Sequence, residues 1–258
     1  MKKFCLAVVF LSLLLFPVLG HAAIDLTNAS NPNIYTGITS PGGDGSIWNV
    51  LNAPPTGTGN YDPFLSFSTS QGVSAGAGIE QALNTNEKSI QVYNDAKQAN
   101  NYTRAVRWSE LQIDNGYYIF TFDLDEALNV RDRYLSIDAL KLYSGTSDSP
   151  LTTDGLTLEW TFMGYPVLMD QSLSSSGNGT DDIMVKIPYA NVTPTYEWMF
   201  MYVQMGGVGL VDGRDYGAMN GFEEVRAQFG PNQVPEPTTL LLLGLGLIGM
   251  AGVRRFKK

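Results

Sequence analysis

The densest group of acidic side chains comprises Asp123, Asp125, Glu126 and Asp132. Oxygen donors at such close spacing suit Ca²⁺, which takes about six to eight of them. If a strand continues through Asp125, the carboxylates of Asp123 and Asp125 lie on one of its faces. The alternative is a solvated turn that pairs its charges with Arg131 and Arg133, since the EF-hand loop pattern and its glycine are missing. Asp123, Asp125 and Asp132 are therefore candidate Ca²⁺ ligands, against the competing expectation that the protein has no cofactor.

Other acidic residues suggest weaker alternatives. The adjacent pair Asp181-Asp182 and the segment 212–215 are less dense versions of the same calcium pattern. Paired carboxylates also serve glycosidases, but spacing along a sequence cannot show two of them facing each other across a cleft. Five glutamates are candidates in this sense only: Glu110, Glu159, Glu197, Glu223 and Glu224.

Histidine and cysteine are each present once, as His21 and Cys5, and both lie in the N-terminal segment. The chain beyond residue 22 therefore lacks disulfides, cysteine nucleophiles, His-assisted serine triads and the usual zinc ligands. We expect a protein that is not an enzyme.

Tryptophan and tyrosine side chains offer a second kind of site, because aromatic rings can stack on sugars. Trp48 lies in a polar, glycine-rich stretch and is the candidate glycan contact. Trp160 shares the alternation of Leu156, Leu158 and Phe162, so core packing is expected there instead.

Strand signals dominate from Phe64 onward. Apolar residues alternate with polar ones at 156–162 and 183–187, and large apolar residues recur at every second position of 118–124, so each segment should bury one face. Asn115-Gly116 predicts a hairpin between strands 106–113 and 117–124, with a bulge near Ser109-Glu110 to explain a change of phase. Segment 198–205 is apolar on both alternations and reads as a central strand, a helix being the alternative. Segments 75–86 and 87–97 are the best places for short helices. The expected fold is all-β: one β-sandwich, jelly-roll-like, within residues 64–230 and preceded by a Gly/Pro/Asn-rich region at 23–63.

The two ends carry transport signals. Lys2 and Lys3, an apolar run and small residues before a cut after Ala22 form the pattern of a secretory signal peptide at residues 1–22, with an uncut signal anchor as the alternative. Near the other end, residues 238–253 form an apolar segment of about 24 Å as a helix, short for a bilayer core of about 30 Å. The basic residues Arg254, Arg255, Lys257 and Lys258 can extend it and keep that end cytoplasmic. A buried core helix is the alternative.

The sequence Val234-Pro235-Glu236-Pro237, followed by an apolar helix and Arg254-Arg255, resembles the PEP-CTERM sorting signal of exported bacterial proteins. The resemblance covers residues 231–258 and implies recognition of Pro235, Glu236 and Pro237 by an exosortase. Residues 117–143 and Gly221-Phe222-Glu223-Glu224 are loosely similar to other PEP-CTERM β-sandwiches, which implies a shared fold and no known activity.

Without its two ends, the chain has a more negative net charge. The chain as a whole has a net charge of −9, but residues 23–234 contain ten basic and 24 acidic residues. A net charge near −14 repels nucleic acid and anionic membranes. The signal-peptide pattern and the resemblance to the PEP-CTERM signal imply a non-enzymatic cell-surface or extracellular-matrix protein, exported through the secretory translocon and cut by signal peptidase. Exosortase then processes its inner-membrane-anchored form. The alternatives are a carbohydrate-binding module of the exopolysaccharide matrix, with or without Ca²⁺, and a glycan-active enzyme.

Overall fold

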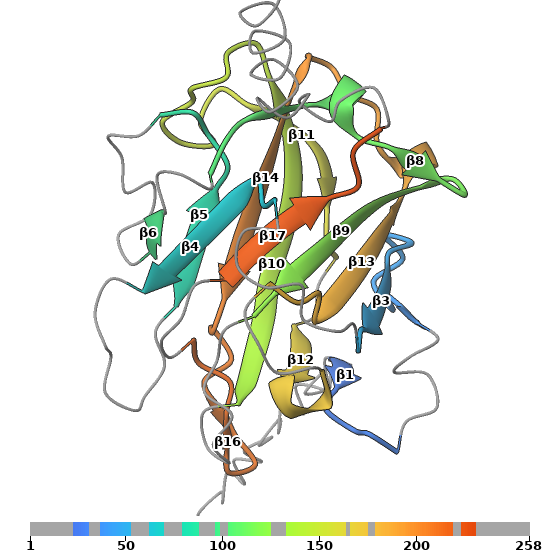
Figure 1. Cartoon of the computed structure of the whole chain (residues 1–258), viewed down its shortest axis with the longest axis vertical. Helices are drawn as coiled ribbons and strands as arrows, with labels where there is room; N and C mark the ends of the chain where they lie inside the picture. Colours follow the sequence, from blue (N-terminus) through green and yellow to red (C-terminus); the bar gives the residue numbers. More distant parts are fainter. Residues whose placement is uncertain are drawn as a thin grey trace, which may run out of the picture.

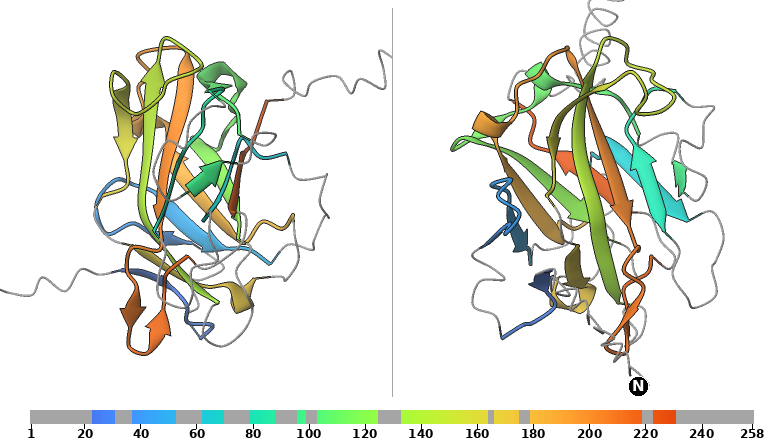
Figure 2. Two further views of the ribbon diagram at one scale, coloured as in Figure 1. Left: turned by 90° about the vertical axis from the view of Figure 1, so that its left-hand side faces the viewer. Right: turned by 180° about the vertical axis from the view of Figure 1, so that it is seen from behind.

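The computed structural model of the chain describes residues 23–30, 37–52, 62–69, 79–87, 96–98, 103–124, 133–163, 166–174, 179–218 and 223–230. Within these ranges the protein is all-β, and its two large sheets pack face to face as a β-sandwich (Figures 1 and 2). None of the helices in the described ranges has the length and apolar character that crossing a membrane requires. The predicted signal peptide, the sorting motif and the apolar segment at 238–253 lie outside the described residues.

The first sheet has the strand order β1-β12-β10-β14-β5, with β11 also paired to β10 and β7 to β14. Its strands are β1 (Ile24–Leu26), β5 (Glu80–Leu83), β7 (Val106–Arg107), β10 (Tyr134–Gly145), β11 (Thr157–Thr161), β12 (Val167–Asp170) and β14 (Trp198–Met205). All pairings are antiparallel except that of β1 with β12, which is parallel.

The second sheet has the order β2-β3-β13-β9-β17-β4-β6, with β8 paired to β9. Its strands are β2 (Ile38–Thr39), β3 (Ile47–Val50), β4 (Leu65–Thr69), β6 (Ala96–Gln98), β8 (Ile113–Asp114), β9 (Tyr117–Asp123), β13 (Ile183–Pro188) and β17 (Glu223–Ala227). A separate hairpin pairs β15 (Leu210–Val211) with β16 (Arg214–Asp215) and projects beyond the end of the sandwich (Figure 2). Three short 3₁₀ turns complete the described structure: η1 (Trp108–Glu110), η2 (Gln171–Leu173) and η3 (Tyr189–Asn191).

The core lies between the two sheets and follows the alternation of the strands. Phe120 and Phe122 of β9 and Val185 of β13 face it from the second sheet, and Leu142 and Val203 face it from the first. Each of these side chains is fully buried. Full burial of such a side chain contributes about 1.5–3 kcal/mol, so the inner faces supply most of the favourable energy of folding.

Several predicted elements are confirmed. Strands form at 117–123, 157–161, 183–188 and 198–205, and Asn115 and Gly116 take the positive φ values, 49° and 85°, of a tight hairpin turn. In β14, the core-facing side chains are fully buried. The other face is covered only in part, by a small cluster around Phe200.

Two predictions are wrong. Residues 80–83, expected within a helix, form strand β5, because pairing with β14 buries them against the first sheet. Segment 106–113 is not one strand with a bulge. The 3₁₀ turn η1 divides it, β7 pairs with β14 of the first sheet, and β8 pairs with β9 of the second. The change of phase therefore marks a crossing between sheets.

Candidate functional site

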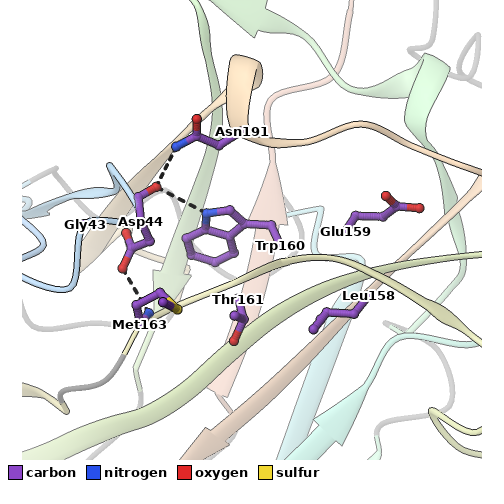
Figure 3. Close-up of a pocket in the computed structure, with 8 residues that line it drawn as sticks. All are labelled: Gly43, Asp44, Leu158, Glu159, Trp160, Thr161, Met163 and Asn191. Atoms are coloured by element: carbon purple, nitrogen blue, oxygen red, sulfur yellow. Dashed lines mark hydrogen bonds between the residues drawn. The ribbon is translucent and has the colours of Figure 1, made fainter.

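A groove with a volume of about 310 Å³ opens beside strand β11 (Figure 3). Its lining residues are Gly43, Asp44, Leu158, Glu159, Trp160, Thr161, Met163 and Asn191. They come from three places: β11 with the residues that follow it, the loop between β2 and β3, and the 3₁₀ turn η3. We call this the β11 groove.

Asp44 fixes one end of the β11 groove. One carboxylate oxygen accepts hydrogen bonds from Ser40 Oγ at 2.7 Å and Met163 N at 2.9 Å, and the other accepts from Ser46 N at 2.8 Å. The backbone carbonyl of Asp44 accepts from Asn191 Nδ2 at 2.9 Å and from the Trp160 indole at 3.4 Å (Figure 3). Because Asp44 is buried and its oxygens are engaged with the chain itself, it positions the groove and is not directed at a ligand.

A β-bulge in β11 sets the direction of the side chains at the end of the groove opposite Asp44. Leu142 of β10 pairs with Trp160, but the next residue, Tyr143, pairs with Leu158, so Glu159 is an extra residue. Leu158 and Trp160 consequently face opposite sides of the sheet, and Leu158 is 50% exposed. The prediction that Leu158 shares the core face of Trp160 is wrong for this reason.

Glu159 lies at the far end of the groove from Asp44 (Figure 3). Its Oε1 accepts hydrogen bonds from Ser144 Oγ and, at 2.8 Å, from Thr195 N. The two carboxylates of the groove thus differ: Asp44 is enclosed by donors, and Glu159 is half-exposed. With half-exposed Leu158 and Met163 beside Thr161 and Asn191, the groove combines apolar walls with a few polar groups, which is the composition of a binding site for a small polar ligand.

The tryptophans do not form an exposed stacking surface. Trp48, the predicted glycan contact, is fully buried, where its indole donates to Ser46 Oγ at 3.0 Å and packs on Phe162. Its position in β3 turns the ring into the core, so the expectation of an exposed ring is wrong. Trp108 and Trp160 are also buried. Trp198 is half-buried, with the Arg107 guanidinium 4.6 Å from its ring centroid.

Two tyrosines are exposed near the groove. Tyr189 belongs to the same turn as Asn191 and meets Tyr118 edge-on at 5.7 Å; Tyr196 is the other. Burial, and next the neighbouring Tyr189, raises the pKa of Tyr118 to about 12. Tyr118 therefore stays neutral at physiological pH, and its ring packs edge-on against that of Tyr189.

The predicted calcium ligands are described only in part. Asp123 ends β9, is almost fully buried and accepts a hydrogen bond from Gly179 N at 2.7 Å, whereas Asp125 and Asp132 lie outside the described residues. In the part of the chain that the structure describes, no three Asp, Glu, His or Cys side chains are arranged to hold a metal. The structure does bring Asp182 next to Asp123. Burial, assisted by the charges of Asp123 and Asp181, raises the pKa of Asp182 to about 7 against the effect of its hydrogen bonds.

The sequence contained weak signals for the groove residues that were missed. Asp44 lies between Gly43 and Gly45, whose φ values are 78° and 76°, and such a loop commonly uses an aspartate to hold its own backbone. Asn191 gave no such signal, because long-range packing alone brings it to β11, and Glu159, a residue of β11 itself, was a candidate only as one of five glutamates.

A family model provides the one comparison that matches. Residues 233–255 match the PEP-CTERM protein-sorting motif. This segment lies beyond the last described residue of the sandwich and contains Pro235, Glu236, Pro237, Arg254 and Arg255. No curated protein and no solved structure matches the chain. The molecule is thus a two-sheet β-sandwich followed by a segment that matches the PEP-CTERM protein-sorting motif, and this motif supports export and sorting by exosortase.

Proposed function

We propose that this protein is a non-enzymatic cell-surface or extracellular-matrix protein whose β-sandwich is delivered by exosortase processing. The observation that carries the proposal is the sorting motif at residues 233–255. In this scheme residues 1–22 direct export and are removed after Ala22. The apolar segment 238–253 then holds the chain in the inner membrane, with its basic end, Arg254 to Lys258, in the cytoplasm.

The position of the motif also indicates the order of membrane anchoring and cleavage. An apolar segment short of the bilayer thickness is a weak anchor, and the Pro-Glu-Pro sequence precedes it on the side where the sandwich lies. Cleavage at this junction would free the sandwich from the membrane and leave the basic tail behind.

The non-enzymatic part of the proposal rests on the chemistry of the described side chains. The chain beyond residue 22 contains neither histidine nor cysteine, and the two carboxylates of the β11 groove are not equivalent. A glycosidase needs two carboxyl groups that both reach the substrate. Asp44, with three hydrogen bonds from the protein, is unsuited to that role.

The sorting proposal is tested by replacing Pro235, Glu236 and Pro237 together with alanine in the host. We expect an unprocessed form that stays in the membrane fraction, detected by immunoblotting of cell fractions. The matched control replaces Pro231 and Asn232, which directly precede the matched segment, with alanine. Normal processing of the triple variant would refute the assignment.

A second candidate function, carbohydrate binding, is favoured by the β11 groove. The half-exposed Leu158 and Met163 provide apolar contacts for the faces of sugar rings. Thr161, Glu159 and Asn191 provide polar groups that can form hydrogen bonds with sugar hydroxyls. The absence of an exposed tryptophan there favours hydrogen bonding over stacking as the main contribution.

Glycan-array binding by the full-length chain in detergent, with and without Ca²⁺, tests this candidate. Leu158→Ser should weaken binding by roughly fivefold, or about 1 kcal/mol. Leu151→Ser, at a similarly exposed leucine outside the groove, is the control and should bind like the unmodified protein. Equal binding by the two variants would remove the groove from consideration, and release of reducing ends from a bound glycan would contradict the non-enzymatic assignment.

A further inference from the structure

Asp182 Oδ1 and Gln171 Oε1 are among the buried side-chain oxygens that accept no hydrogen bond within the described residues. Asp182 is completely buried and Gln171 is 7% exposed. Leaving a buried polar atom unpartnered is unfavourable, and more so when the group is charged. Two such atoms, on side chains that both hydrogen-bond to Leu124, point to a ligand from outside the chain.

Both side chains are fixed against the same residue. Leu124 N donates to Asp182 Oδ2 at 2.8 Å, and Gln171 Nε2 donates to the Leu124 carbonyl. One polar atom of each head group is thus held at Leu124, directly after the end of β9. The remaining oxygen of each side chain lies at the same junction, where β9, the start of β13 and the turn η2 meet.

The backbone keeps this junction rigid. Asp182 N donates to the Phe122 carbonyl at 2.8 Å, and Leu51 N donates to the Asp182 carbonyl at 2.7 Å. On the other side, Gln171 N donates to the Arg133 carbonyl at 2.9 Å. The backbones of Asp182 and Gln171 are thus tied to neighbouring segments on both sides of Leu124.

The local charge is negative. Asp123 precedes Leu124, is almost fully buried and lies close enough to Asp182 to oppose its ionisation. Asp181 differs from both, because Arg226 pairs with its carboxylate through two nitrogens. The junction therefore combines carboxylate and carboxamide oxygens, which are hard donors that suit Ca²⁺.

We propose that Asp182 Oδ1 and Gln171 Oε1 are ligands of a calcium ion, beside the Asp123 carboxylate, which supplies a second negative charge. The carboxamide of Gln171 stands where a third carboxylate, beside those of Asp182 and Asp123, would otherwise be expected. The site joins η2, which follows β12 of the first sheet, to β9 and β13 of the second, so the bound ion stabilises the contact between the two layers. It lies apart from the β11 groove and is independent of sorting.

Calcium-dependent stability of the full-length chain in detergent tests the proposal. After treatment with EDTA and dialysis, we expect the midpoint of thermal unfolding to rise in excess CaCl₂, and not in MgCl₂ at the same ionic strength. Calorimetric titration with CaCl₂ should give one site, which Asp182→Asn weakens by at least about tenfold. Gln171→Met, which removes the carboxamide at similar volume, should have the same direction of effect.

Asp181→Asn is the matched control, because it makes the same substitution one residue away on a side chain paired with Arg226. It should lose stability modestly and keep the calcium response. If the unmodified protein shows no calcium-dependent shift, or if Asp182→Asn binds calcium as well as Asp181→Asn does, the proposal is overturned. A magnesium response equal to that of calcium would also overturn it. Should either variant fail to fold, the comparison of CaCl₂, MgCl₂ and EDTA on the unmodified protein still decides.

Discussion

At the scale of single residues, Asp44 shows how one side chain can organise a surface. Its carboxylate accepts hydrogen bonds from Ser40 and Ser46 within the loop between β2 and β3. It also accepts one from Met163 N, in the segment that follows β11. Its carbonyl holds Asn191 of η3. Three segments that are far apart in sequence therefore depend on a single loop residue for their position around the β11 groove.

Replacement of this residue should be costly. Asp44→Ala leaves the Ser46 and Met163 amides without their acceptor, so we expect the free energy of unfolding to fall by about 2–4 kcal/mol. Urea unfolding followed by tryptophan fluorescence measures the change. Asp154→Ala, at an exposed turn, is the control and should differ from the unmodified protein by no more than about 0.5 kcal/mol. Equal stability of the two variants would show that Asp44 does not support the groove.

At the scale of elements, the sequence predicted strands far better than their partners. The alternation in 117–124 and 183–187 identified β9 and β13, because a period of two is a local property of a half-buried strand. Alternation does not reveal which sheet a strand joins. Segment 106–113 shows this: its change of phase is compatible with a bulge and with a turn, and only packing against both β14 and β9 selects the turn η1.

The site residues were harder to predict than the strands, for a related reason. Gln171 and Asp182 meet at Leu124 across 47 and 58 residues of sequence. No local pattern encodes such a meeting, and the calcium ligands predicted at the acidic cluster around Asp123 stay a prediction. The prediction for Leu158 failed for the opposite reason. Its local alternation was clear, but one extra residue in β11 turns the Leu158 side chain to the outer face of the sheet.

At the scale of the whole molecule, stability should depend on pH through Asp182. Its pKa in the folded protein, about 7, lies above the ordinary value of 3.8, mainly because of burial, with Asp123 of β9 and the adjacent Asp181 adding to the rise. Between these two values the folded state binds more protons than the unfolded state. The contribution of Asp182 to the free energy of unfolding is therefore greatest below pH 4 and is lost as the pH rises through about 7.

Chemical unfolding in EDTA at a series of pH values measures this dependence. The slope due to this group is at most about 1.4 kcal/mol per pH unit. Because other carboxylates also titrate, the informative quantity is the difference between the unmodified protein and Asp182→Asn, which should lack this component. Identical pH profiles for the two proteins would show that Asp182 has an ordinary pKa.

The position of β17 bears on how the protein resists mechanical load. This strand is the last of the sandwich and is hydrogen-bonded on both edges, to β9 and to β4. Just beyond it, Gly230 N donates to the Glu110 carbonyl, and Gln112 N donates to the Gln228 carbonyl. A pull on the residues that follow Gly230 is thus transmitted to an interior strand and to η1. Such a strand cannot be peeled away one hydrogen bond at a time from a free edge, so a domain held through the residues after Gly230 would withstand shear better than one held through an edge strand.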